Sequence, residues 1–213
     1  MKKYFYLLIA GILTLCTVHA QIKKGDVQLG GSLSFGTGST KNYNYTNKST
    51  NVTVSPSFGM AVQDNLVIGV SLLYGHNPTK YGNPQYEYGS DQYGGGIFAR
   101  RYRSIGKSFS VFMEWNLVGQ YEHTNSGYTD SLVNSNVRTY NFSTGLYPGI
   151  AYNISRRVQV ETSLPYLIYA NYQHSKAEGE SYNNVLVKTN TFNIGSSLNR
   201  SLQNLVIGIK CLL

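Results

Sequence analysis

Apolar and polar side chains alternate along most of the chain after residue 26. In the segment 27–35, Val27, Leu29, Leu33 and Phe35 are separated by polar or small residues. A period of two is typical of a β-strand with one apolar face. The alternation occurs in eight segments, at residues 27–35, 52–62, 66–75, 86–102, 109–122, 140–152, 158–172 and 188–213. The pattern predicts an all-β protein of eight strands, the last with a register shift near residues 199–203.

The connections between these segments alternate in length. Three are short and lie at residues 63–65, 103–107 and 153–157. Four are long, rich in Asn, Ser, Thr, Gly and Tyr, and lie at residues 37–49, 76–85, 123–137 and 173–187. This order puts both chain ends on the side of the short turns. It predicts an antiparallel, up-and-down transmembrane β-barrel with four long extracellular loops.

The first twenty residues have a different character. Met1-Lys2-Lys3 is followed by a largely apolar stretch that ends in Val18-His19-Ala20. A basic start, a short apolar core and small residues before a cut are typical of a cleavable signal peptide. We therefore expect cleavage between Ala20 and Gln21, leaving residues 21–213 as one barrel domain. The expected mature chain keeps a single cysteine, Cys211, which excludes an internal disulfide.

Composition bears on which way the barrel faces. Charged residues make up 13% of the chain, against about 25% in soluble proteins. The polar face is mostly Gly, Ser and Asn, which suits a narrow polar lumen with the apolar face toward lipid. A secreted lipocalin-like carrier, with its apolar face inside, is the alternative. The exposure of Val54, Val111 and Ile168 against that of Ser55, Glu114 and Glu161 distinguishes the two directions.

Four charged residues fall on the predicted inward face: Arg100, Glu114, Glu161 and Lys210. Unpaired charges in a narrow lumen would be costly, so we expect these four to neutralise one another in a hydrogen-bonded cluster. Such a cluster can serve as a plug or as the gate of a thin ion path. An eight-stranded lumen is just wide enough for side chains to fill, which favours the plug.

Other residues suit the boundaries of a bilayer. At the short-turn side Arg101, Arg103, Arg156 and Arg157 are expected to reach phosphate head groups. Aromatic residues near strand ends suit interfacial girdles. The candidates are Tyr74, Trp115, Tyr121, Tyr140, Tyr152 and Tyr172. No metal-ligand cluster, cofactor motif or nucleic-acid motif is present in the sequence.

The whole expected mature chain resembles the outer-membrane β-barrel family of OmpA-like and OmpX-like eight-stranded proteins, often catalogued as porin-family proteins. The resemblance rests on four motifs: Ser55-Pro56-Ser57-Phe58-Gly59, Asp64-Asn65-Leu66-Val67-Ile68-Gly69, Phe98-Ala99-Arg100-Arg101-Tyr102 and Pro148-Gly149-Ile150-Ala151-Tyr152. It implies an outer-membrane location and insertion by the barrel-insertion machinery. Members usually end in an aromatic residue that this machinery recognises, whereas this chain ends in Leu213, which bears on insertion efficiency.

Some barrels of this size are lipid A acyltransferases or deacylases with a His and Ser pair near the outer rim. The candidate bases here are His76, His123 and His174, with Ser126 and Ser175 close in sequence. A histidine base needs an orienting acid and a nucleophile within hydrogen-bond reach. The spacing does not establish such a set, so no residue is assigned a catalytic role.

The sequence therefore predicts a non-enzymatic, monomeric outer-membrane barrel with a filled polar lumen. Its loops, where tyrosine stands beside asparagine, are expected to serve surface interaction, adhesion or envelope integrity. Outer-membrane lipids, lipopolysaccharide and a surface ligand of unknown identity are the expected partners. A narrow channel for small solutes and, less favoured, a lipid A-modifying enzyme stay open as alternatives.

Overall fold

A computed structural model describes residues 22–42, 45–82, 85–106, 108–128, 131–164, 167–179, 186–196 and 206–213. These residues form ten strand segments. They are β1 (Val27–Asn42), β2 (Tyr45–Gln63), β3 (Leu66–Gly82), β4 (Gln85–Ser104), β5 (Phe109–Tyr128), β6 (Ser131–Asn153), β7 (Val158–Ser163), β8 (Ile168–Gly179), β9 (Leu186–Gly195) and β10 (Val206–Leu212). The expected signal peptide and its cleavage site at Ala20 and Gln21 lie outside the described residues.

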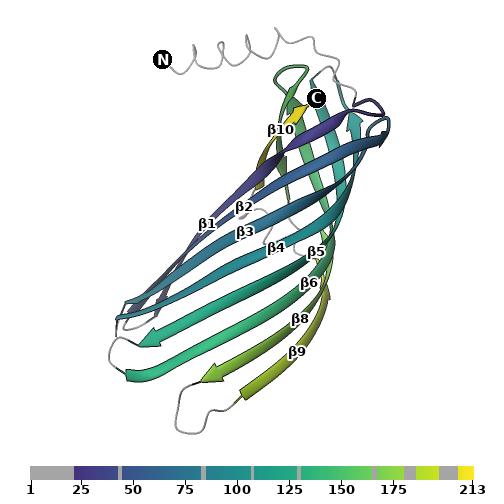
Figure 1. Cartoon of the computed structure of the whole chain (residues 1–213). Helices are drawn as coiled ribbons and strands as arrows, with labels where there is room; N and C mark the ends of the chain where they lie inside the picture. The colour runs from purple at the N-terminus through teal and green to yellow at the C-terminus, as the bar shows by residue number, and fades with distance from the viewer. Residues whose placement is uncertain are drawn as a thin grey trace, which may run out of the picture.

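The strands close into a barrel. Each of β1 to β6 pairs antiparallel with the next, β6 pairs with β7, β7 with β10, and β10 with β1. The last of these pairings joins the first strand to the last, where Leu213 N donates to Val27 O at 2.9 Å. Figure 1 shows the strands crossing the barrel obliquely. The predicted all-β barrel of eight antiparallel strands is confirmed.

Ten segments make eight spans because the last two spans are interrupted. β7 and β8 belong to one span and β9 and β10 to the next. The uninterrupted strand expected over 158–172 is wrong, because pairing with β6 stops at Ser163 and resumes at Ile168. Pro165 lies in this interval and has no N–H to donate to a ladder. The register shift expected near residues 199–203 lies outside the described residues.

The predicted long loops are a second difference. Much of residues 37–49, 76–85, 123–137 and 173–187 belongs to strands, and β1 and β2 stay paired as far as Asn42 and Tyr45. An antiparallel ladder continues as long as both strands carry free backbone groups, whatever the polarity of their side chains. The result is a set of hairpins that extend past the apolar part of the wall. We call their end of the barrel the loop end and the opposite end the short-turn end.

The direction of the side chains decides between lipid-facing and soluble barrels. Val54, Val111 and Ile168 are 45%, 37% and 53% exposed, whereas Glu161 is 6% exposed. Large apolar side chains are exposed on every strand from β1 to β6, as well as on β8, β9 and β10. The soluble-carrier alternative is wrong, because its apolar face would have to point inward. Among the described residues, no helix is long and apolar enough to cross a membrane.

The short-turn half of the lumen is filled by side chains. Val67 and Ala151 are fully buried there, together with Ala61, Phe98, Tyr102, Phe112, Leu212 and Ile22 of the segment preceding β1. The aromatic rings fit because glycine lies beneath them. A Cβ added at Gly69 would come within 2.6 Å of the Phe98 ring, and one added at Gly149 would overlap the Phe112 ring. This half of the interior is therefore a packed core.

Candidate functional site: the charge cluster of the lumen

Arg100 is the centre of a polar network inside the barrel. It lies on β4 between Phe98 and Tyr102 on the inward face, and its partner across the β4–β5 pair is Glu114. Arg100 Nε donates to Glu114 Oε2 at 2.7 Å, and Arg100 Nη2 donates to the same oxygen. The hairpin between β4 and β5 sets this contact, because opposed residues on antiparallel strands carry their side chains on the same face.

The other charged members come from distant parts of the chain. Arg100 Nη1 donates to Glu161 Oε2 on β7 at 2.5 Å, and Lys210 Nζ on β10 lies 3.7 Å from Glu161 Oε1. Lys210 Nζ also donates to Ser57 Oγ on β2 at 2.5 Å. Two cations thus face two carboxylates, all with side chains at most 14% exposed. The structure brings together all four residues of the expected lumen cluster.

Aromatic rings and amides surround the guanidinium of Arg100. Its Cζ atom lies 4.5 Å from the centroid of the Phe112 ring and 5.8 Å from that of Tyr102. Arg100 Nη1 donates to Tyr102 Oη at 3.1 Å, and Gln28 Nε2 donates to the same oxygen at 2.9 Å. Arginine stacks well on aromatic faces because it is planar and weakly hydrated. Sequence reasoning placed none of Gln28, Ser57, Tyr102 and Phe112 in the cluster, although alternation puts all four on inward faces.

A cavity of about 360 Å³ adjoins the cluster. Arg100, Glu114, Glu161 and Lys210 line one part of it. Serines and glutamines of β1 to β5 line much of the rest, together with apolar and aromatic side chains that include Leu73, Phe98, Val118, Tyr147 and Val206. The packed core begins on the other side of Arg100, at Tyr102 and Phe112. The lumen is thus polar and partly hollow on the loop-end side of the cluster, and it is filled by side chains on the short-turn side.

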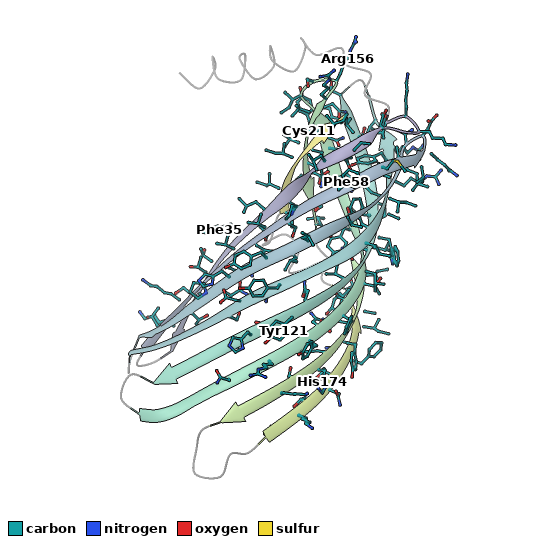
Figure 2. The ribbon with its side chains drawn as sticks, viewed as in Figure 1. Phe35, Phe58, Tyr121, Arg156, His174 and Cys211 are labelled. Carbon is teal, nitrogen blue, oxygen red and sulfur yellow. The ribbon has the colours of Figure 1, made fainter. Side chains whose placement is uncertain are left out.

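The four expected interfacial arginines are exposed. Arg101 and Arg103 project outward from the short-turn half of β4, because they alternate with the inward Arg100 and Tyr102. Arg156 and Arg157 lie in the turn between β6 and β7, and Figure 2 shows Arg156 at the short-turn end. The two pairs differ in surroundings, since the first lies against the barrel wall and the second in a turn.

The expected aromatic girdle residues divide into groups. Tyr74, Tyr121 and Tyr140 belong to one row of opposed residues that crosses four strands, and Tyr93 completes it. The rings of Tyr74 and Tyr93 have centroids 5.4 Å apart, and those of Tyr121 and Tyr140 are 5.3 Å apart. This row lies on the loop-end side of the apolar wall.

The other three girdle candidates lie elsewhere. Tyr172 lies opposite Phe142 on β6 and Phe192 on β9, next to the tyrosine row. Trp115 lies opposite Ala99 and Leu146, inside the apolar band. Tyr152 packs on Phe109 at the short-turn end, with ring centroids 4.8 Å apart. Tyr93 was not among the expected girdle residues, because its strand alternates poorly around Gly94, Gly95 and Gly96.

The three candidate histidines, His76, His123 and His174, lie toward the loop end, where Figure 2 shows His174. His76 Nδ1 is 2.8 Å from Asp91 Oδ1, and His174 Nδ1 is 2.7 Å from Asn190 Oδ1. Ser175 bonds to Thr139 Oγ1 at 3.0 Å. As the neighbour of His174 in a strand, it faces the other side of the sheet. Among the hydrogen bonds of the described residues, none joins one of these histidines to a serine, and the side chain of Ser126 lies outside the described residues.

Comparisons with known proteins bear on the fold. The outer membrane protein OprG from Pseudomonas aeruginosa is similar over 90% of this chain and 97% of its own, with a TM-score of 0.51 and 10% identity. The fold is that of an eight-stranded outer-membrane β-barrel. The apolar exterior and this fold are those of barrels that span an outer membrane.

Two further solved structures align with this barrel at lower scores. A major outer membrane protein from Thermus thermophilus aligns over 89% of this chain and 99% of its own length, with a TM-score of 0.48 and 10% identity. Neisserial surface protein A aligns over 87% of this chain and 95% of its own length, with a TM-score of 0.39 and 13% identity. No protein-family model matches the sequence, and no curated protein matches it.

Proposed function

We propose that the protein is a non-enzymatic outer-membrane barrel with a closed lumen, and that it acts through the hairpins at its loop end. The observation that carries this proposal is the network around Arg100. Its guanidinium bonds to carboxylates on β5 and β7, and Lys210 joins β10 to both β7 and β2. Five strands of the wall, β2, β4, β5, β7 and β10, are thus tied together across the lumen.

Opening a path through this network would be costly. Each charge would lose a buried partner, and breaking a buried ion pair costs about 3–5 kcal/mol. The packed core beyond Tyr102 and Phe112 would also have to open. At this free-energy cost only a very small fraction of the molecules would have an open lumen at any time, which supports the plug.

The hairpins at the loop end support a role at the cell surface. β5 and β6 continue past the tyrosine row from Tyr121 to Tyr128 and from Tyr140 back to Ser131. Of the described outward side chains there, His123 and Arg138 are polar or charged. A paired ribbon of this kind presents side chains in fixed positions, which suits adhesion or contact with a surface ligand. The apolar wall below it contacts outer-membrane lipids, lipopolysaccharide included, and the barrel acts as a monomer.

Conductance in planar bilayers tests the closed lumen. The wild-type barrel is expected to show no steady conductance, whereas Arg100→Ala combined with Glu161→Ala removes the central ties and should produce flickering openings. Arg138→Ala combined with Glu122→Ala is the matched control, because it removes the same two charges away from the cluster. A steady wild-type conductance that changes in Glu114→Gln or Lys210→Met would overturn the closed lumen.

A narrow conduit for small solutes is the second candidate, and the cavity of about 360 Å³ favours it. It predicts that liposomes containing the wild-type protein release a small polar solute faster than empty liposomes. It also predicts that release slows when the cavity is filled, as in Ser55→Phe. Equal release from protein-containing and empty liposomes would exclude the conduit and support the closed lumen.

A further inference from the structure

A groove of about 890 Å³ runs along the outside of the barrel on β4, β5, β6 and the end of β7. Its outward residues form two rows of opposed positions. Arg101, Met113 and Pro148 form the first row, and Arg103, Val111, Ile150 and Thr162 form the second. The groove therefore has an apolar floor that ends at two arginines.

The interrupted span explains why the wall is hollow at this place. Pairing of β6 with β7 ends at Gly149 and Ser163, and pairing of β6 with β8 begins at Leu146 and Ile168. Between them, Leu164 N donates to Pro148 O at 3.0 Å and Leu167 N donates to Leu146 O at 2.8 Å. The backbone polar groups are thus partly satisfied while the regular row of side chains is broken. A break in a ladder bends the strand and redirects the neighbouring side chains.

Arg101 and Arg103 have the chemistry of an anion site. They lie two residues apart on one face of β4, both are exposed, and each lies opposite an apolar residue of β5, Met113 or Val111. Among the described side chains, neither arginine has a carboxylate partner. Two guanidinium groups beside each other repel unless an anion lies between them, and guanidinium binds phosphate in a bidentate geometry.

We propose that this groove binds an anionic phospholipid of the periplasmic leaflet, with the phosphate at Arg101 and Arg103 and an acyl chain along the apolar floor. The short-turn end, where both arginines lie, is the periplasmic end of such barrels. A volume of 890 Å³ falls within the range of about 300–1,000 Å³ typical of small-molecule sites. The apolar floor selects a lipid over free phosphate, which has no group to place there.

The proposal rests on the direction of the barrel wall and is independent of whether the lumen is closed. Trp115 provides a reporter, because it is the only tryptophan of the chain and lies two residues from Met113 on the same outward face. Lipids with brominated acyl chains quench tryptophan fluorescence on contact. Quenching of Trp115 therefore measures which lipid occupies the wall beside the groove.

The experiment reconstitutes the full barrel in phosphatidylcholine vesicles that contain increasing fractions of brominated phosphatidylglycerol or of brominated phosphatidylcholine. The brominated anionic lipid is expected to quench at a severalfold lower mole fraction. Each arginine near a membrane surface contributes about fivefold in affinity for anionic lipid. Arg101→Gln combined with Arg103→Gln should remove the preference, whereas Arg156→Gln combined with Arg157→Gln, equal in charge but set in a turn, should keep it.

A third variant separates a built groove from general attraction of anionic lipid to a basic surface. Thr162→Phe fills the groove and keeps both arginines, so it should also reduce the preference. The heat-dependent shift of folded barrels on gels verifies that each variant is folded. Equal quenching by the two lipids, or a preference that survives either Arg101→Gln with Arg103→Gln or Thr162→Phe, would overturn the proposal. Addition of inorganic phosphate should leave the preference unchanged, and its loss would show an anion site without a lipid groove.

Discussion

Arg100 and Glu114 occupy opposed positions on β4 and β5, and the guanidinium of Arg100 holds the carboxylate of Glu114 on the inward face of that hairpin. The same guanidinium also reaches Glu161 on β7. One local contact thus joins a set of contacts that crosses the lumen. The charged residues of this cluster differ in how many oppositely charged partners they have. Their contributions to the stability of the barrel are therefore expected to differ in a measurable way.

Replacing Glu161 by glutamine should destabilise the barrel more than replacing Glu114. Glu161 neutralises both Arg100 and Lys210, so its loss leaves two buried cations with one carboxylate. We expect a loss of about 3–5 kcal/mol in the free energy of unfolding for Glu161→Gln and about 1–3 kcal/mol for Glu114→Gln. Urea unfolding in lipid vesicles, followed by Trp115 fluorescence, measures both values. Glu122→Gln on the same face of β5 is the control, and an equal loss there would contradict a special role for the cluster.

Gly149→Ala tests the packing of the aromatic plug. The added methyl group would overlap the Phe112 ring, which lies against Arg100 and Tyr102 and has little room to move. Overpacking of this kind costs about 1–3 kcal/mol. Gly89→Ala on β4 meets nothing within 4 Å and should leave the free energy of unfolding nearly unchanged. Similar unfolding midpoints for the two variants would show that the plug is loosely packed.

Lys176→Glu is expected to stabilise the barrel. Lys176 on β8 lies opposite Arg138 on β6 and opposite Lys188 on β9, so three cations stand in one row. Like charges opposed across strands are unfavourable, and an opposite charge in the middle should gain up to about 1 kcal/mol. The gain should shrink in high salt because exposed charges are screened. Lys41→Glu, opposite Thr46, makes the same change without opposed cations and should show no gain.

Nitroxide labels test the direction of the wall. In a Cys211→Ser background, a label at Val54→Cys should collide more often with oxygen, which concentrates in lipid, than with a water-soluble nickel complex. A label at the adjacent Ser55→Cys, which lines the lumen cavity, should show less of this preference. Electron paramagnetic resonance saturation gives both collision rates. The same behaviour at the two positions would contradict an apolar exterior and a polar interior.

The sequence allowed the cluster to be predicted because each member stands on the polar face of an alternating segment. Parity alone put Arg100, Glu114, Glu161 and Lys210 inside. The aromatic members were missed for the opposite reason. Tyr102 and Phe112 are large and apolar in character, so alternation by polarity assigned them no role, although position two residues from Arg100 and from Glu114 places them inward.

The lengths of the loops were mispredicted because side-chain polarity marks the membrane boundary and not the end of a strand. Asn, Ser and Thr in residues 37–42 end the apolar pattern, yet the backbone ladder between β1 and β2 continues. The interruption near Leu164 was missed for a related reason. Apolar and polar residues alternate both before and after the interruption, so the sequence pattern does not reveal it. Only the pairing with β6 shows that this span has more residues between Ser163 and Ile168 than β6 has between Leu146 and Gly149.

By itself the sequence determined which side chains share a face of the barrel wall, because a strand sends successive side chains to opposite sides; the exposure of the apolar face then showed that it points outward. The pairing of Arg100 with Glu114 follows from the register of β4 and β5, which the short turn between them fixes. Only the tertiary structure decided that Glu161, Lys210 and Ser57 meet them. That depends on how far β10 is displaced along β1 and β7 when the barrel closes, and strands so distant in sequence have no turn to fix their register. The lipid-facing groove likewise exists only where the interrupted wall and Arg101 and Arg103 come together.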